Sequence, residues 1–141
     1  MAHSLVDPAT IEAYYTTDYR VIGDDGFVLR VSERSTALLA TYQRCDVDCC
    51  AFITACNPHS QLLESGQNEA RLGRLEAELR EGRWSIRAGI GQHPSNGWPA
   101  EPSFLVLGIP LEEARALGAR HSQTAIVWAG ADALPQLVML R

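Results

Sequence analysis

The chain has 141 residues, the length of one ordinary domain, and its 46% hydrophobic and 21% charged residues are typical of a globular protein. All 12 basic residues are arginine, which excludes Schiff-base catalysis, a phosphate-binding P-loop lysine and a lysine general base. The 17 acidic residues bring the net charge to −5, which argues against nucleic acid and against an anionic membrane surface as partners.

The first third of the chain predicts a helix, a β-hairpin and a second helix between residues 7 and 45. Asp7-Pro8 places a capping side chain before a proline, which marks the start of a helix. The stretches 19–22 and 27–31 flank a Gly-Asp-Asp-Gly turn cluster and therefore predict a hairpin. Residues 35–44 have the apolar spacing of a helix.

Six elements follow between residues 50 and 130, in the order strand, helix, strand, strand, helix, strand. This order predicts an α+β fold with an antiparallel sheet and a ferredoxin-like split βαβ core (βαββαβ). Three of these strands are apolar on both faces, so we expect the N-terminal helix, hairpin and helix to cover the other face of the sheet. The whole chain, 1–141, is predicted to be a single domain with a C-terminal tail over 131–141. The predicted strands are 51–56, 84–90, 103–109, 124–129 and a short one at 137–140, and the predicted helices are 68–81 and 110–120.

The predicted topology brings the ends of several elements to one rim of the sheet, where polar side chains gather. Asn68 lies one helical turn before the core residue Leu72, so its side chain is expected to point inward, and Arg71 can reach the same place. Because a helix N-terminus attracts negative charge, the rim predicts a site for a small anionic ligand, such as a nucleotide or an acidic metabolite. The candidate ligand-binding residues are Asn57, Ser60, Asn68, Glu69, Arg71, Trp98, Ser103 and Gln123.

Residues 93–102 form a predicted hairpin connection over this rim, stiffened by three prolines. Trp98 offers a flat stacking surface, and Glu101 is the candidate catalytic residue, as a general base or as an acceptor for ligand hydroxyl groups. His93 and His121 lie next to loops, where solvated histidines are more common than catalytic ones. The sequence contains no catalytic triad order, P-loop or dinucleotide fingerprint, so no cofactor is predicted and whether the protein is an enzyme stays open.

Each candidate residue also has a structural interpretation. Asn68 is equally suited to cap its helix, since asparagine is a leading N-cap residue. Arg71 and Glu101 are suited to a structural ion pair, which is more common than a catalytic pair. Trp98 can simply pack on its own loop, and Gln123 can satisfy backbone groups at the start of a strand.

Four cysteines, Cys45, Cys49, Cys50 and Cys56, lie within twelve residues. A disulfide framework would spread its cysteines along the chain, so reduced thiols in a cytoplasm fit better. A zinc site completed by an aspartate or His59 is the alternative, but the spacing matches no usual ligand pattern. Buried free thiols, and no metal, are therefore predicted.

Two further features concern location. The segment Met1 to Tyr15 lacks the basic start and the continuous apolar stretch of a signal peptide. The longest apolar run, Phe104 to Ile109, is too short to cross a bilayer. We therefore expect a cytoplasmic protein without a membrane partner.

The residues of the predicted rim, together with the strand before them, resemble the signature of a bacterial family catalogued as domain-of-unknown-function family 3293. The most specific part is the run Phe-Ile-Thr-Ala-x-Asn-Pro, which ends at Asn57-Pro58, with Cys56 where the family usually has another, often aromatic, residue. The similarity runs from about Tyr14 to the C-terminus. It implies a small soluble bacterial protein and no particular activity. Its other parts are Asn68-Glu69 with Arg71, Glu101-Pro102-Ser103-Phe104 and Gln123.

Two hypotheses of different classes follow. The first is a small-molecule site, with Arg71 among the binding residues and Glu101 as the acid or base. The second is a regulatory module without enzymatic activity, whose rim or exposed sheet edge binds another protein. Nucleic-acid binding is the least favoured, because the arginines are scattered and the total charge is negative.

Overall fold

The computed structural model describes residues 6–141. In it, the first two helices each begin after a residue whose side chain caps the helix. The Asp7 side chain accepts a hydrogen bond from the N–H of Ala9 (2.8 Å) and caps helix α1 (Pro8–Thr16). The Ser35 hydroxyl accepts from the N–H of Leu38 (3.0 Å) and caps α2 (Thr36–Cys45). The first five residues of the segment Met1 to Tyr15, which was predicted not to be a signal peptide, lie outside the described residues.

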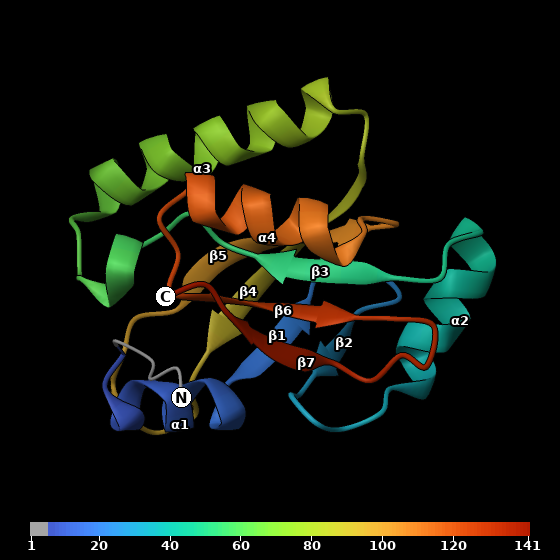
Figure 1. The fold of residues 1–141 in the computed structure, drawn as a ribbon, viewed down its shortest axis with the longest axis horizontal. Coiled ribbons are helices and arrows are strands. Elements are labelled where there is room, and N and C mark those ends of the chain that lie inside the picture. The colour runs from blue at the N-terminus through green and yellow to red at the C-terminus, as the bar shows by residue number, and fades with distance from the viewer. Residues whose placement is uncertain (1–5) are drawn as a thin grey trace.

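The described residues form a curled antiparallel sheet of seven strands, in the order β2-β1-β4-β5-β3-β6-β7, with four helices (Figure 1). The predicted α+β class with an antiparallel sheet is therefore confirmed. The strands are β1 (Asp18–Val21), β2 (Phe27–Leu29), β3 (Cys50–Ile53), β4 (Ser85–Gln92), β5 (Glu101–Leu107), β6 (Ala125–Ala129) and β7 (Gln136–Met139), and the two remaining helices are α3 (Ser65–Glu81) and α4 (Leu111–Arg120).

Both faces of the central strands are covered, as their apolar composition predicts. Helices α3 and α4 lie on one face, where Leu75 and Leu117 pack against Ile53 and Val106. Helix α2 packs its Leu38 on the other face. Helix α1 lies on that same side but at the other end of the sheet (Figure 1). A sheet apolar on both faces thus becomes the middle layer of three.

One part of the predicted cover is wrong. The hairpin formed by β1 and β2 does not lie over the sheet but extends it, because β1 pairs with β4 in the register Tyr19 with Gly91. Without this pairing, the N–H and C=O groups along the free side of β4 would form an open edge. The curl of the sheet still brings Tyr19 and Leu29 into the core beneath α2.

Several boundaries differ from the sequence-based expectation, and two of them have a cause in their hydrogen bonds. Strand β3 ends at Ile53, not at residue 56, because the next pairs of its register reach Pro102, which has no N–H to donate. Helix α3 begins at Ser65, three residues before the predicted start, and the side chain of Gln67 accepts a hydrogen bond from the N–H of Glu64 (3.2 Å). Asn68 therefore lies inside the first turn of α3 and does not cap it.

Candidate functional site

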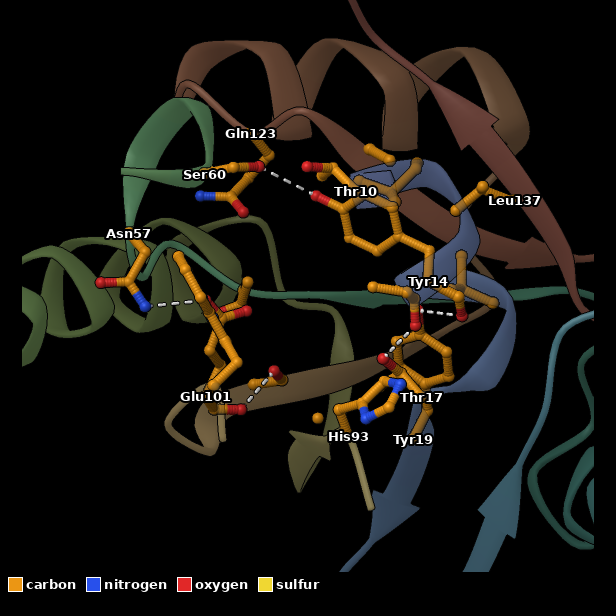
Figure 2. A pocket seen from close by; sticks show the side chains of 18 of the residues that line it. Thr10, Tyr14, Thr17, Tyr19, Asn57, Ser60, His93, Glu101, Gln123 and Leu137 are labelled. Carbon is orange, nitrogen blue, oxygen red and sulfur yellow. Dashed lines mark hydrogen bonds between the residues drawn. The ribbon is translucent and has the colours of Figure 1, made fainter. Parts of the chain in front are cut away.

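A cavity of about 270 Å³ lies between α1, the sheet face beneath it and the segment that connects β4 to β5 (Figure 2). Its floor comes from β3, β5 and β6, and its rim includes the turn after β3. Figure 2 shows Asn57 and Glu101 on one side, Tyr14 and Tyr19 on the other, and Ser60 with Gln123 at one end. The polar lining residues are Thr10, Tyr14, Thr17, Tyr19, Thr54, Asn57, Ser60, His93, Asn96, Glu101, Ser103 and Gln123.

The turn after β3 carries two of these residues in an uncommon backbone conformation. Asn57 (φ 48°), His59 (φ 53°) and Ser60 (φ 60°) all have left-handed φ values. Asparagine tolerates this region, but for other non-glycine residues it is strained, and such strain concentrates at functional sites. The turn begins where Thr54 leaves the sheet and donates its hydroxyl to the carbonyl of Pro102 (2.7 Å).

Asn57 makes several hydrogen bonds that hold this turn together, and only 5% of the residue is exposed. Its Oδ1 accepts from the N–H of Leu63 (2.9 Å) and from Nδ2 of Asn68 (2.9 Å). The Asn68 side chain in turn accepts from the N–H of Asn57 (2.8 Å). Nδ2 of Asn57 is left to donate to Oε2 of Glu101 (2.7 Å). The buried amide therefore links the start of α3 to the carboxylate in the cavity.

Glu101 places a carboxylate in a largely apolar wall. Oε2 accepts from Asn57 and from the indole Nε1 of Trp98 (3.1 Å), whereas Oε1 accepts no hydrogen bond from the described residues. Burial raises the pKa of the Glu101 carboxyl, and the two donated hydrogen bonds offset part of this rise. Ser103, which is buried beside it, donates to the main-chain oxygen of Glu101 (2.9 Å). The arrangement suits proton exchange with a bound molecule, or acceptance of a hydrogen bond from one.

Arg71 lies behind the rim and does not line the cavity. Its Nε donates to the carbonyl of Ala55 (2.8 Å) and its Nη2 to the carbonyl of His121 (2.7 Å). The ion pair with Glu101 that the sequence suggested is not formed, because Arg71 donates to main-chain oxygens. The guanidinium instead joins the turn after β3 to the loop before β6.

Gln123 donates hydrogen bonds to the main chain and also lines the cavity. Its Nε2 donates to the carbonyls of Cys56 and His121 (both 3.2 Å), so the predicted role of satisfying backbone groups is confirmed. The residue is 7% exposed and lines the cavity. Because both neighbours of Nε2 are carbonyl oxygens, the amide orientation is fixed, and Oε1 is the atom free to meet a ligand.

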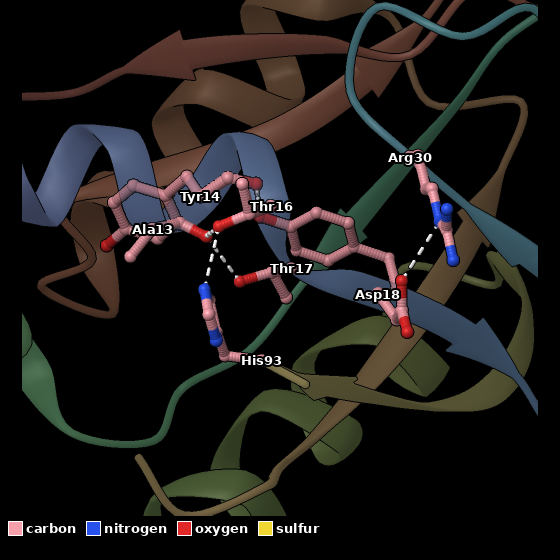
Figure 3. Close-up of polar contacts among 8 residues, drawn as sticks. Ala13, Tyr14, Thr16, Thr17, Asp18, Arg30 and His93 are labelled. Atoms are coloured by element: carbon pink, nitrogen blue, oxygen red, sulfur yellow. Dashed lines mark hydrogen bonds and ion pairs between the residues drawn. The ribbon is translucent and has the colours of Figure 1, made fainter. Parts of the chain in front are cut away.

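Helix α1 closes the cavity through side chains that bond to the rest of the site. The Tyr14 hydroxyl lies 3.3 Å from Ser60 Oγ, which lies 2.8 Å from the hydroxyl of Thr124. Thr16 Oγ1 lies 2.7 Å from Nε2 of His93, on the connection after β4 (Figure 3). Burial raises the pKa of the Tyr14 hydroxyl, which keeps it protonated. No residue of α1 is fully buried, so these contacts hold a helix without a core of its own.

Six of the nine residues predicted for the site line the cavity, and three do not. Asn68 and Arg71 support the rim from behind, and Glu69 is exposed on α3. Trp98 lines the cavity and bonds to Glu101, so it does more than pack on its loop. The six residues that line it are Asn57, Ser60, Trp98, Glu101, Ser103 and Gln123.

The two histidines differ from the solvated interpretation. His93 is partly buried and lines the cavity. His121 lies outside it, with 12% of its side chain exposed and Nε2 lying 3.5 Å from Oε1 of Glu78. Burial lowers the pKa of the His121 imidazole, and the nearby carboxylate of Glu78 opposes that shift.

The sequence missed the wall that α1 provides. Ala9, Thr10 and Ala13 line the cavity together with Tyr14. Such small side chains cannot fill the space between a helix and a sheet. Their spacing on a helix that was expected to cover the sheet is therefore the signal in the sequence that could have predicted a cavity beneath it. Phe52 and Tyr19, which belong to the core, line the cavity as well.

The four cysteines are free. Cys50 and Cys56 are buried, and the Cys49 thiol donates to the carbonyl of Ile109 (3.2 Å). Burial raises the pKa of the Cys56 thiol, which keeps it protonated beside the rim. Within residues 6–141, no three Cys, His, Asp or Glu side chains lie close enough together to hold a metal ion.

Over the same residues, no helix combines the length and the apolar character needed to span a bilayer. Searches of curated proteins and of solved structures returned no match. A family model described as a protein of unknown function (DUF3293) matches residues 53–126, slightly more than half of the chain. The matched segment begins in β3, ends in β6 and contains all nine residues predicted for the site. The chain belongs to the DUF3293 family.

Proposed function

We propose that the protein binds a small molecule in the cavity beneath α1, with Glu101 as the group that anchors the ligand or exchanges a proton with it. The observation that carries the proposal is the convergence of separate chain segments on one cavity, where two of them donate hydrogen bonds to the carboxylate of Glu101. Asn57 comes from the turn after β3, Trp98 from the connection after β4, and Gln123 from the loop before β6. A concave apolar site with a few convergent polar groups is the usual form of a small-molecule site.

The size and charge of the cavity limit the ligand. Its volume of about 270 Å³ lies just below the range of roughly 300–1,000 Å³ that drug-sized ligands occupy, so a small metabolite fits best. The sequence favoured an anionic ligand because of a helix N-terminus and Arg71 at the rim. The Arg71 guanidinium is occupied by two carbonyls, and no residue of α3 lines the cavity. The argument for a negative charge on the ligand is thereby removed.

Two finer expectations remain proposals. A ferredoxin-like relationship of residues 50–129 is supported by the order β4-β5-β3-β6 with every neighbouring pair antiparallel. A bacterial, cytoplasmic protein is supported by the family resemblance and by the free thiols.

The proposal is tested by a thermal-shift screen of nucleotides, organic acids, amines and sugars against three forms of the protein. Ala13→Trp fills the cavity from α1, whereas Ala77→Trp puts the same side chain on the exposed surface of α3. We expect ligands that raise the Tm of the wild type and of Ala77→Trp but not of Ala13→Trp. Ligands that stabilise Ala13→Trp equally bind elsewhere and contradict the proposal. A null result over all classes would favour the alternative, a protein partner at the same rim.

A further inference from the structure

The electrostatic character of the cavity points to the charge of its ligand. Among the described residues that line it there is no arginine, and Glu101 is the acidic one. Both ring nitrogens of His93 already have partners within the protein, because Nδ1 accepts hydrogen bonds from the N–H groups of Ser95 (3.1 Å) and Asn96 (3.0 Å) and Nε2 lies 2.7 Å from Oγ1 of Thr16.

Two acceptor atoms in the cavity lack a donor from the described residues. One is Oε1 of Glu101, since both donors to that carboxylate reach Oε2. The other is Oε1 of Gln123, whose Nε2 hydrogens are used by two carbonyls. Only 7% of Gln123 is exposed, so the surrounding structure holds its free oxygen in place. A ligand that fills the cavity must donate hydrogen bonds to avoid leaving these oxygens desolvated.

The remaining walls favour a positive charge on that donor. Trp98, Tyr14, Tyr19 and Phe52 present aromatic rings to the cavity. The face of an aromatic ring attracts cations, and the attraction grows when water is excluded. A divalent metal ion fits less well than an organic cation, because Glu101 supplies the one carboxylate among the described lining residues. In the part of the chain that the structure describes, no three His, Cys, Asp or Glu side chains lie close enough together to hold a metal ion.

We propose that the ligand is a small organic cation whose ammonium group donates to Oε1 of Glu101 and to Oε1 of Gln123, with its apolar part between the aromatic walls. This inference rests on the proposed function and adds the chemical class of the ligand. A buried carboxylate without a cationic partner is costly to keep ionised, which the raised pKa of Glu101 reflects. An ammonium ligand supplies the missing partner.

The test uses probes of one shape and different charge. Benzylamine, benzyl alcohol and benzoate are titrated into the ¹⁵N-labelled protein at pH 7, and the set is repeated with cyclohexylamine, cyclohexanol and cyclohexanecarboxylate. Dissociation constants come from amide chemical shifts. Because a charge-assisted hydrogen bond is roughly twice as strong as a neutral one, we expect each amine to bind at least about tenfold more tightly than its alcohol. The shifts should include Phe52, Gln123 and Glu101, and each carboxylate should bind most weakly.

Two variants separate the local carboxylate from the overall charge. Glu101→Gln removes the charge in the cavity with almost no change of shape, and Glu69→Gln removes one charge from the exposed surface of α3. We expect Glu101→Gln to lose the preference for amines and Glu69→Gln to keep it.

Alcohols or carboxylates that bind at the cavity as tightly as the amines would overturn the cationic ligand and leave the proposed small-molecule site standing. An amine preference that survives in Glu101→Gln overturns it in the same way. Failure of all six probes to shift cavity residues at about millimolar concentration would count against both proposals.

Discussion

Arg71→Ala separates a structural arginine from a ligand-binding one. The substitution removes the hydrogen bonds from Arg71 to the carbonyls of Ala55 (2.8 Å) and His121 (2.7 Å). A hydrogen bond from a charged donor contributes about 1.5–3 kcal/mol, and because Arg71 is partly exposed we take the lower figure for each bond. The expected loss is therefore about 3 kcal/mol in the free energy of unfolding. For a chain of this size that corresponds to a fall in Tm of roughly 10 °C.

The assay is urea unfolding followed by circular dichroism, together with a thermal melt. Arg74→Ala is the matched control, because Arg74 lies on the same helix, is exposed and donates no hydrogen bond within the described residues. Arg71→Lys tests the geometry, since a single ammonium group cannot reproduce the fork that reaches two carbonyls, and we expect it to recover less than half of the loss. If Arg71→Ala melts within about two degrees of the wild type, a range that corresponds to under 1 kcal/mol, the structural role is refuted.

Three further substitutions test other parts of the structure. Glu101→Gln should raise the Tm at pH 7. Because the pKa of the Glu101 carboxyl is raised in the folded protein, its ionisation costs stability at pH values above 4.5, the ordinary pKa of a glutamate. The gain should vanish in melts below pH 4.5, and a lower Tm at pH 7 would contradict the reasoning. Tyr42→Phe removes the hydroxyl that donates to the carbonyls of Ala129 (3.1 Å) and Gly130 (3.0 Å) at the end of β6 and should cost about 1 kcal/mol in urea unfolding, whereas the exposed Tyr15→Phe should cost nothing measurable. Gly89→Ala places a Cβ 2.6 Å from the ring of Phe52 and should cost about 1–3 kcal/mol through overpacking; an unchanged urea midpoint would mean that the ring moves freely.

The elements themselves could be predicted because their signals are local. Asp7 before Pro8 begins α1, as expected, and the alternating segment forms strand β4, in which Ile86 and Ile90 are half-buried but Ala88 is exposed. Where a boundary was misjudged, the deciding partner was distant or of an unexpected type. The end of β3 depends on Pro102, which is 49 residues after Ile53 and has no N–H.

The direction of a polar side chain was harder to predict. Arg71 and Asn57 were both predicted to lie at the rim. Arg71 instead lies behind it and donates to two carbonyls, whereas Asn57 lines the cavity and donates to Glu101. Which backbone oxygens lack a partner depends on how loops end, and periodicity carries no information about that.

The sequence by itself determined the residue types available for chemistry: no lysine, one glutamate before an apolar strand, and a motif specific enough to indicate the family. Only the tertiary structure decided that α1 becomes a wall of the cavity and that Oε1 of Glu101 and Oε1 of Gln123 are left without donors. The physical reason is that hydrogen-bond satisfaction and empty volume are properties of several chain segments together. They arise when α1, the turn after β3 and the loop before β6 pack against one another, and no single segment encodes them.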